Sequence, residues 1–196
     1  MKLYSYIVKH DRGLAPNPFH GYCTLAVCTP NHMGIKPEKG DWIAGFSSKS
    51  DGNKLVYAMQ VSETMHFKDY FHDARFQNKK PDLKGDWKER CGDNFYEFNS
   101  EGKPIQHPNP FHKEDKVYQK DIKHPYVFIA EHFYYFGEKA ESMPVDFQEL
   151  VYRYRGYKHN FQESVVEGFL AWLKQNWKPG ISGNPKHREL DRGKGC

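Results

Sequence analysis

The sequence predicts an α+β fold in which a curved, mainly antiparallel β-sheet carries a C-terminal helix. Residues 54–63 alternate between two faces with a period of two, which is typical of a half-buried strand. Residues 126–136 form a run of β-branched and aromatic side chains, which favours a buried central strand. Residues 162–177 place Val165 and Phe169 at helical spacing, followed by Trp172 and Leu173, which indicates an amphipathic helix.

The other elements follow in chain order. Three further strands are expected, at residues 2–9, 23–28 and 42–47. The proline-rich bend at 15–20 excludes a helix there, because proline lacks the amide hydrogen that a helix needs. A short helix is expected at 142–152, after Pro144. All five strands are expected in one sheet, with 126–136 at its centre.

Residues 74–124 differ in character from the rest of the chain. Gly-Asp and Lys-Pro turns follow one another there with few aliphatic residues between them, which predicts a loop-rich insertion with one or two short strands, such as 94–98. Aromatic residues such as Trp87 and Phe95 need somewhere to pack, which argues against disorder throughout. The length of 196 residues fits one domain over 1–196 that contains this insertion.

The composition predicts a core built from Phe, Tyr and Trp. Hydrophobic residues make up only 38% of the chain, whereas aromatic residues reach 16%. Aromatic side chains bury a large area and Tyr and Trp carry a polar group, so the same rings also suit a stacking pocket. For any individual ring, a place in the core is the alternative to a place in such a pocket.

The net charge of +4 is concentrated near the end of the chain. From residue 178 onward five cations stand against two acids, so the rest of the chain is close to neutral. A near-neutral body argues against a broad groove that follows phosphates and favours a pocket reader or a small-ligand site. The basic end is expected as a solvated, frayed terminus, with contact to a nucleic-acid backbone as the alternative.

The cysteines and the first twenty residues both favour a reduced, cytoplasmic protein. Cys23 and Cys28 are five residues apart, so in a strand they face opposite sides, and the four cysteines form no disulfide framework. Residues 1–20 contain charges and no continuous apolar run, so neither a signal peptide nor a membrane span is visible. We therefore expect a reduced, cytoplasmic protein with no membrane partner.

No familiar catalytic motif is present in the sequence. The nucleophile elbow G-x-S-x-G, the zinc motif H-E-x-x-H, the Walker A loop and the dinucleotide fingerprint G-x-G-x-x-G are absent. Eleven histidines invite a metal hypothesis, but their spacing lacks the paired ligands of zinc sites. We expect neither a metal nor a cofactor, and the sequence leaves open whether the protein is an enzyme.

The order of motifs from residue 39 to residue 73 resembles PUA-like barrels, in particular EVE-type and ASCH-type domains. A Gly-Asp turn at 40–41 leads into a strand, a loop, a second strand that ends in Val-x-Glu at 61–63, and a short aromatic helix at 66–73. In those families such elements surround a pocket that receives a nucleobase. The resemblance implies a PUA-like curved antiparallel sheet or barrel, with a loop-rich insertion and a C-terminal helix.

A second resemblance covers most of the chain. The opening at 1–11, the segments 15–19 and 21–28, the turn at 40–42 and the Leu-Val-Tyr-Ala run at 55–58 together resemble the second family of nucleotide modification associated domains. That family is known mainly from bacterial and phage gene neighbourhoods that modify DNA bases. The resemblance implies that the partners are a modified nucleotide or nucleic acid and, as a further possibility, proteins of a DNA-modification or phage-defence system.

One group of candidate site residues lies near the start of the chain. His10 and Asp11, with Asn17, Tyr22 and Thr24, offer the donors and acceptors that suit the edge of a flipped base, and an aromatic ring that can stack on it. The alternative for Asn17 is simple turn chemistry around two prolines. If the protein is an enzyme, His10 and Asp11 are its candidate acid–base groups, with His159 as a further candidate.

Two further groups complete the candidate site. By the PUA-like resemblance, Trp42 forms a wall of the base pocket and the polar residues Ser47, Ser48 and Lys49 supply donors at its mouth; the alternative is that Trp42 enters the core after a tight turn. Near residue 155, cations stand beside aromatic rings, and a charged loop is the alternative to contact with phosphate. The candidates in that segment are Arg155 and His159.

These observations favour a binding module that reads a modified nucleotide or base through an aromatic, polar-edged pocket. A reader needs only stacking and hydrogen bonds, whereas no complete catalytic set is visible. The alternatives are a nucleotide- or base-modifying enzyme that uses His/Asp acid–base groups, and a structural partner in a modification complex. The sequence distinguishes neither the base nor its modification, and it leaves open whether the ligand is a free nucleotide or a polymer.

Overall fold

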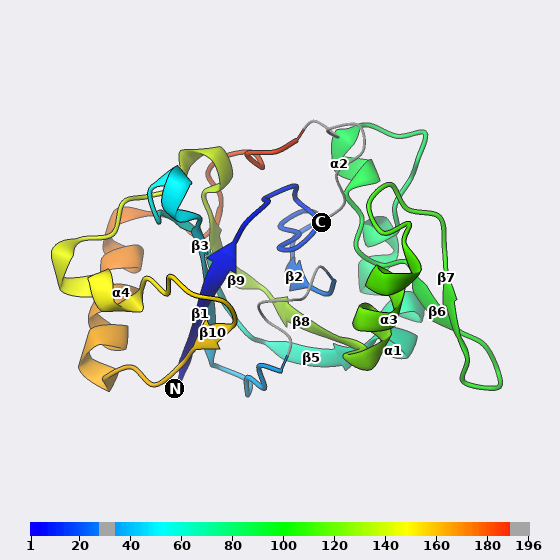
Figure 1. The fold of residues 1–196 in the computed structure, drawn as a ribbon, viewed down its shortest axis with the longest axis horizontal. Helices are drawn as coiled ribbons and strands as arrows, with labels where there is room; N and C mark the ends of the chain where they lie inside the picture. Colours follow the sequence, from blue (N-terminus) through cyan, green and yellow to red (C-terminus); the bar gives the residue numbers. More distant parts are fainter. Residues whose placement is uncertain (28–33, 189–196) are drawn as a thin grey trace.

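The computed structural model describes residues 1–27 and 34–188 of the chain (Figure 1). The strands are β1 (Leu3–Val8), β2 (Cys23–Leu25), β3 (Trp42–Ser47), β4 (Leu55–Gln60), β5 (Glu63–His66), β6 (Tyr96–Phe98), β7 (Pro104–Gln106), β8 (Tyr126–Ala130), β9 (His132–Tyr135), β10 (Tyr157–Lys158) and β11 (Gly180–Ile181). The α-helices are α1 (Phe67–His72), α2 (Trp87–Arg90), α3 (Asp115–Lys123) and α4 (Glu163–Asn176). The 3-10 helices are η1 (Lys49–Asp51), η2 (Ala74–Lys79), η3 (Gly137–Lys139) and η4 (Val145–Leu150).

The described strands form three sheets. The largest has six strands in the order β10-β1-β3-β4-β9-β11, the second has the order β2-β8-β5, and β6 and β7 make a separate hairpin. The pairs β1–β3 and β9–β11 are parallel, and the other pairs are antiparallel. The predicted α+β class is therefore confirmed, but these strands do not close into a barrel.

The prediction of a single sheet is wrong because two long strands bend from one sheet into the other. The expected central strand at 126–136 is interrupted at Glu131 into β8 and β9, and the expected strand at 54–63 ends at Gln60. β4 pairs with β9 in the large sheet, whereas β5 pairs with β8 in the small one. At the corner, Ser62 N donates to Ile129 O at 2.8 Å. Two bent segments, β4–β5 and β8–β9, thus pair with each other along both sheets.

A β-bulge changes the side-chain alternation in β4. Tyr57, Met59 and Val61 face the core between the two sheets, as the period of two predicts. Leu55 was expected on the same side, but it packs on the opposite face of the large sheet. The register between β3 and β4 shifts so that Val56 is the extra residue, and an extra residue reverses the side of every side chain beyond it.

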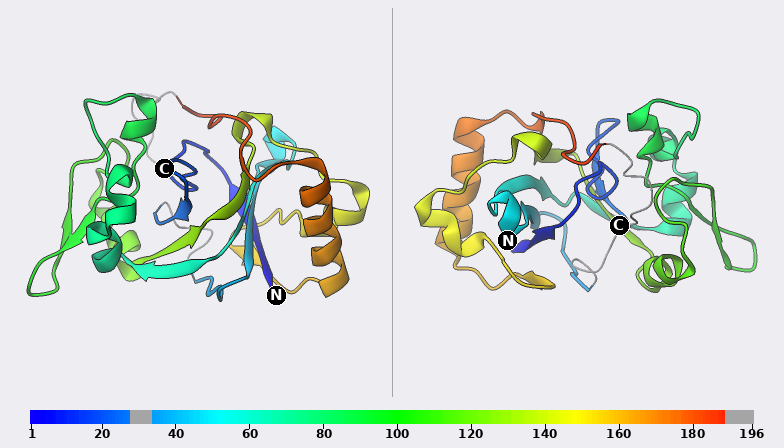
Figure 2. Two further views of the ribbon diagram at one scale, coloured as in Figure 1. Left: turned by 180° about the vertical axis from the view of Figure 1, so that it is seen from behind. Right: turned by 45° about the horizontal axis from the view of Figure 1, so that its top comes forward.

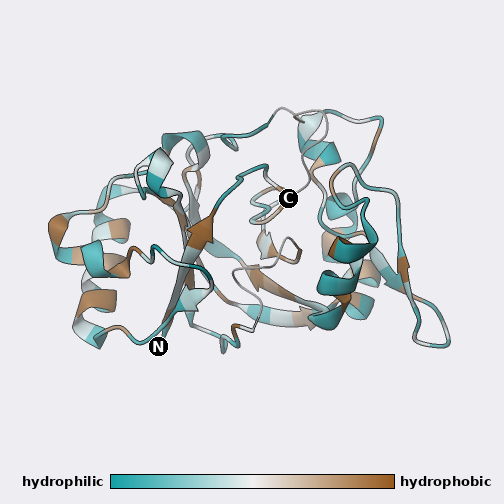
Figure 3. Cartoon of the chain, in the orientation of Figure 1, coloured by the Kyte–Doolittle hydropathy of each residue, from teal (hydrophilic) through white to brown (hydrophobic). Residues whose placement is uncertain are grey.

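The two sheets enclose one apolar core, and each has a second core on its outer face. The inner core joins side chains from β1, β2, β3, β4, β8 and β9. Helix α4 covers the other face of the large sheet with Val166, Phe169 and Leu173, and α1 lies on the far side of the small sheet (Figures 1 and 2). Brown, hydrophobic ribbon in β1, β8 and α4 follows these layers in Figure 3.

Residues 74–124 are more ordered than a loop-rich insertion. They contain η2, α2, the β6–β7 hairpin and α3, and the last of these helices was not predicted. Phe76, Phe95 and Tyr96 fill a core against α1 and the small sheet, so the aromatic residues of this stretch do find a place to pack. The helix expected at 142–152 is the 3-10 helix η4, which is shorter.

We expect Gly45→Ala to lower the free energy of unfolding by about 1–3 kcal/mol, the usual cost of overpacking a core. A methyl group at Gly45 would lie 2.5 Å from Val8 Cγ2 and would also meet the Tyr57 ring. In the control Gly168→Ala, the added methyl group meets only the Phe147 ring, at 3.1 Å. Urea unfolding followed by tryptophan fluorescence measures both changes, and equal stability of the two variants would contradict this packing.

Candidate functional site

A cavity of about 100 Å³ lies where β1 and β3 end. Its wall is made by Val8, Asp11, Ser47, Asp51, Lys54, Val56, Gly137, Glu138, Ala140, Lys186 and His187, and we call it the Asp11 cavity. Small-molecule sites usually measure about 300–1,000 Å³, so this cavity is too small to enclose a whole nucleotide. It has room for one chemical group or for the edge of a base.

The Asp11 carboxyl group is the most deeply buried polar group of this wall. The residue is only 3% exposed. The Tyr135 hydroxyl lies 2.7 Å and 2.8 Å from the two carboxyl oxygens, and the amides of Gly13 and Lys186 lie 3.4 Å and 3.3 Å from them. Burial raises the pKa of Asp11, and these hydrogen bonds offset the rise only in part. Asp11 therefore retains a proton to higher pH than an exposed aspartate does.

Residues 182–188 form a strap across this part of the structure. His187 N donates to Asp11 O at 2.8 Å, and Asp11 N donates to His187 Nδ1 at 3.2 Å. The second bond needs a lone pair on Nδ1, so the neutral His187 ring carries its proton on Nε2. The strap also connects to η3, where Glu138 N donates to Asn184 O at 2.7 Å. The frayed end expected from the sequence is thus wrong for 182–188; residues 189–196 lie outside the described part.

A second imidazole stands beside the strap. The His10 ring is edge-on to the His187 ring, with 5.6 Å between their centroids. Burial lowers the pKa of His10, and electrostatic interactions with the nearby His187, Arg12 and Lys9 lower it further. His10 is therefore largely neutral at pH 7 and available to accept a proton. This pairing places both predicted acid–base residues next to the Asp11 cavity, although only Asp11 lines it.

The charged groups on the wall of the Asp11 cavity nearly balance, because Lys54 and Lys186 stand against Asp51 and Glu138 beside the buried Asp11. The half-buried Asp51 pairs with Lys186, and the exposed Glu138 pairs with Arg188 at 3.0 Å. The lysines at positions 49 and 54 are exposed, and neither has an ion-pair partner among the residues that the structure describes. Lys54 lines the cavity and can therefore turn toward an anionic group such as a phosphate, whereas Lys49 does not line it.

The predicted residues Asn17 and Tyr22 surround a buried lysine that the sequence did not single out. Lys79 is fully buried, and its Nζ donates to Asn17 O at 3.1 Å, Asn17 Oδ1 at 2.8 Å and Tyr22 O at 3.0 Å. The Asn17 amide group donates in turn to Cys91 O at 2.8 Å. Burial lowers the pKa of Lys79 to about 8. Asn17 therefore bonds to the protein rather than facing a ligand.

A buried carboxyl group completes this second cluster. The Thr24 hydroxyl donates to Asp93 Oδ2 at 2.5 Å, and the Tyr70 hydroxyl donates to Asp93 Oδ1 at 2.7 Å. Burial raises the pKa of Asp93, and the Lys79 charge opposes that rise. Thr24 is itself fully buried, so its hydroxyl group serves this network. We call Asn17, Thr24, Lys79 and Asp93 the buried polar cluster.

The remaining candidates lie in three different places. Ser47 lines the Asp11 cavity, where its hydroxyl accepts from Lys54 N at 2.9 Å; Ser48 and Lys49 follow it, and the Ser48 hydroxyl lies 2.8 Å from Asp51 Oδ2. Trp42 is buried under α4, with its ring stacked on Tyr134 at 6.3 Å. The other two are exposed near β10: Arg155 and His159.

The structure therefore does not bring Trp42, Tyr22, Asn17 and Ser47 to one cavity. Trp42 belongs to the core beneath α4 and Tyr22 to the core beneath α1, on opposite outer faces of the two sheets. The groups that build the Asp11 cavity and went unnoticed are Tyr135 and His187. Neither stands in a recognisable motif, because each reaches Asp11 only through the sheet pairing and the path of the strap.

The sequence of the chain matches a known protein family over nearly its whole length. A family model described as nucleotide modification associated domain 2 matches residues 1–192. The chain belongs to this family. No curated protein and no solved structure shows a significant match. The family name associates the chain with nucleotide modification. The resemblance of the sequence to the second family of nucleotide modification associated domains is confirmed.

The described residues show neither a metal-binding cluster nor a membrane-spanning helix. Within 1–27 and 34–188, no three His, Cys, Asp or Glu side chains come together in a way that could hold a metal ion. None of the helices in those ranges is both long enough and apolar enough to cross a bilayer.

We expect Trp42→Ala to lower the free energy of unfolding by about 3–5 kcal/mol, because it removes a large ring from the core beneath α4. A smaller loss is expected for the control Trp87→Ala, since Trp87 is half-buried and packs edge-on against Phe19. Chemical denaturation of both variants tests this. A Trp42→Ala variant of full stability would restore the interpretation of Trp42 as the wall of a ligand pocket.

The buried Lys79 predicts a pH dependence of stability. Its pKa of about 8 in the folded chain lies below the ordinary value of 10.5, so between these values the unfolded chain binds more protons. Through Lys79, stability therefore rises with pH over this window, by at most about 1.4 kcal/mol per pH unit. Urea unfolding between pH 8 and pH 10 should show that Lys79→Met removes this contribution, whereas Lys80→Met retains it. The same slope in all three proteins would contradict the burial of a charged Lys79.

Proposed function

We propose that the chain recognises or processes a modified nucleotide or base in a bacterial or phage DNA-modification or defence system, and that it does so at the Asp11 cavity. The observation that carries the proposal is the buried Asp11 carboxyl group, held by Tyr135 at the wall of a small cavity that Lys54 also lines. Membership of the nucleotide modification associated family supports the class of ligand.

The chemistry of the wall suits the polar edge of a base or of its substituent. The Asp11 carboxylate accepts a hydrogen bond when ionised and donates one when protonated, and the Ser47 hydroxyl does either. Base edges present such donors and acceptors in patterns that differ from base to base. Lys54 on the wall supplies a positive charge for a phosphate, and the exposed Lys49 follows Ser48 nearby in the chain. The site therefore pairs groups that specify a base with groups that position its backbone.

The volume of the cavity limits which part of a nucleotide can enter it. About 100 Å³ admits a substituent or one edge of a base, while the sugar and phosphate remain outside. A cavity of this size discriminates by the group that enters it, which suits a reader of the modification itself. The two sheets share one core because the segments β4–β5 and β8–β9 bend from one sheet into the other. This curvature supports the resemblance to PUA-like barrels, whose curved sheets also surround a base pocket.

An enzymatic activity on the same ligand is the second candidate. The adjacent His10 and Asp11 favour it, because a largely neutral imidazole accepts a proton and a buried carboxyl group with a raised pKa can donate one. Such a pair can move a proton to or from a nucleotide group in the cavity. The reader remains the first candidate because binding needs only the wall groups described above.

Binding of nucleotides by matched variants tests this proposal. We expect Asp11→Asn to weaken binding of the preferred modified nucleotide at least tenfold and to reduce its preference over the unmodified form, because the amide replaces one carboxyl oxygen with an NH2 donor and cannot ionise. The control Asp146→Asn removes an exposed carboxylate on η4 and should bind as the wild type does. Isothermal titration against a panel of methylated, hydroxymethylated and glycosylated nucleotides, free and within oligonucleotides, provides the measurement.

Mass spectrometry of the same mixtures separates the two candidates. A reader leaves every nucleotide mass unchanged, whereas an enzyme changes a mass in a way that His10→Ala and Asp11→Asn abolish. Absence of both binding and conversion across the panel would overturn the proposal and favour a structural partner of a modification complex.

A further inference from the structure

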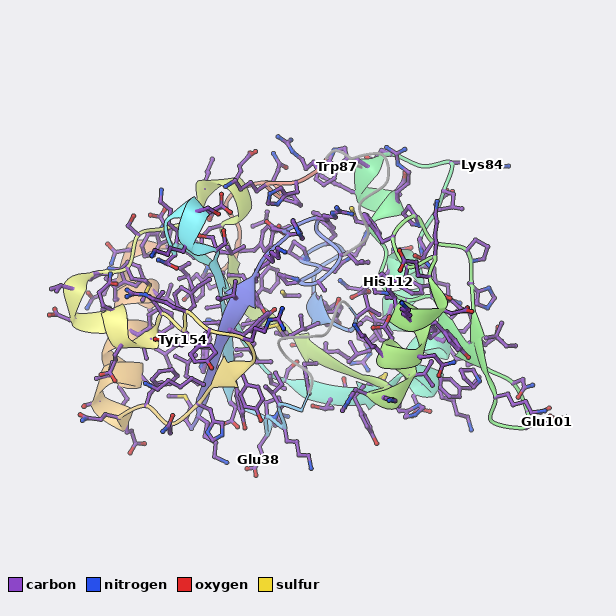
Figure 4. All side chains as sticks on the ribbon, viewed as in Figure 1. Glu38, Lys84, Trp87, Glu101, His112 and Tyr154 are labelled. Carbon is purple, nitrogen blue, oxygen red and sulfur yellow. The ribbon has the colours of Figure 1, made fainter. Side chains whose placement is uncertain are left out.

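The segment 152–159, which follows η4 and includes β10, alternates aromatic rings with cations. It reads Tyr-Arg-Tyr-Arg-Gly-Tyr-Lys-His, and no acidic residue occurs from 150 to 162. Tyr154 is 73% exposed, and Figure 4 shows it on this segment, beside the large sheet. Arg153 and Arg155 are exposed as well. The segment concentrates three cations on the surface of a body that is otherwise close to neutral.

The structure holds the Tyr154 ring at the surface. The Tyr152 hydroxyl donates to Arg155 O at 3.0 Å, which fixes the turn of the loop. The Tyr152 and Tyr154 rings meet edge-on, with centroids 5.7 Å apart. One face of an exposed ring supported in this way is open to stack on another planar group. Base–aromatic stacking tolerates any base sequence, because every base has a π-face.

The cations of the segment are available for phosphate. Within the described ranges, Arg153 forms no ion pair, and its guanidinium group donates to the neutral amide oxygen of Gln148 at 3.2 Å. Among the residues that the structure describes, no carboxylate forms an ion pair with Arg155 or Lys158. The Lys158 ammonium group lies over the Phe161 ring, at 4.7 Å from its centroid.

The segment leads toward the Asp11 cavity. β10 pairs antiparallel with β1, with Tyr157 opposite Tyr6. β1 continues for two more residues to Val8, which lines the cavity, and two residues of a strand span about 7 Å. Because the strands are antiparallel, the chain that precedes Tyr157, including Arg155, lies toward the same end of β1 as Val8.

We propose that the segment 152–159 binds the backbone of a single-stranded nucleic acid, with Tyr154 stacked on an unpaired base and the three cations on its phosphates. This inference rests on the proposed function: it makes the ligand of the Asp11 cavity a base within a strand. An exposed ring needs an unstacked base, which a single strand offers and an intact duplex does not. Few cations are involved, which fits a short track of nucleotides.

Twelve-nucleotide oligothymidine is the probe, because backbone contacts do not depend on a modified base. Fluorescence anisotropy with the full chain should show binding of the oligomer well above that of thymidine monophosphate. Tyr154→Ala should weaken oligomer binding about 5- to 100-fold, the range for one base–aromatic stack, and should leave monophosphate binding unchanged. The matched control Tyr126→Ala removes a half-exposed ring from β8 and should have no effect.

The two arginines have their own test. The double variant Arg153→Gln, Arg155→Gln should weaken oligomer binding and reduce the slope of log K against log salt by about 1.4, since each contact to a single strand contributes about 0.7. The charge-matched control Lys84→Gln, Lys113→Gln alters two exposed lysines outside the segment and should preserve the slope.

Three results would overturn this inference: equal affinity for oligomer and monophosphate, equal behaviour of Tyr154→Ala and Tyr126→Ala, or tighter binding of the corresponding duplex. Failure of the proposed function has a different signature. In that case oligothymidine still binds through Tyr154 and the arginines, but Asp11→Asn changes neither the binding nor the preference for any modified base.

Discussion

The bend that carries two antiparallel segments, β4–β5 and β8–β9, from the large sheet into the small sheet is the constraint on which the rest of the structure depends. Because β4 and β9 continue directly into β5 and β8, the two sheets share an inner core and cannot move independently. The outer face of each sheet packs against a different element: α4 covers the large sheet, and α1 covers the small sheet. The Asp11 cavity lies at the end of this shared core, where β1 and β3 finish.

Two buried carboxyl groups show how this fold treats charge. Asp11 and Asp93 both have a raised pKa because of burial, and both are held by tyrosine hydroxyl groups. Their surroundings differ, because Asp93 shares the buried polar cluster with Lys79, whereas Asp11 lines a cavity. Buried groups that are fully paired stabilise one arrangement of the core, while a buried group beside free space can meet a ligand.

The sequence predicted the elements better than their assembly. Period-two alternation and the run at 126–136 located the strands, because both signals are local. The break at Glu131 and the bulge at Val56 depend on the pairing of distant strands, and neither leaves a local mark. Helix α3 was missed since its residues are mostly polar, as the teal ribbon in Figure 3 shows.

For the site, the residue types were predicted better than their positions. Asp11 and Ser47, which the sequence placed in two separate groups of candidates, line one cavity, and Asp11 is held there by Tyr135 and the strap, which are 124 and more than 170 residues away from it in the chain. Asn17 and Thr24 have the polar groups of a base reader and instead satisfy Lys79 and Asp93. A polar side chain alone does not reveal whether its partner is a ligand or another buried group.

The strap over Asp11 also sets the order in which the site is built during synthesis. Apart from the two edge strands β10 and β11, the strands of both sheets lie before residue 136, so much of the core can assemble while the later part of the chain is still being translated. The cavity wall, however, needs Lys186 and His187, whose backbone contacts to Asp11 span more than 170 residues. A nascent chain whose strap is still inside the exit tunnel therefore carries an incomplete site, and ligand binding begins only after Lys186 and His187 have emerged.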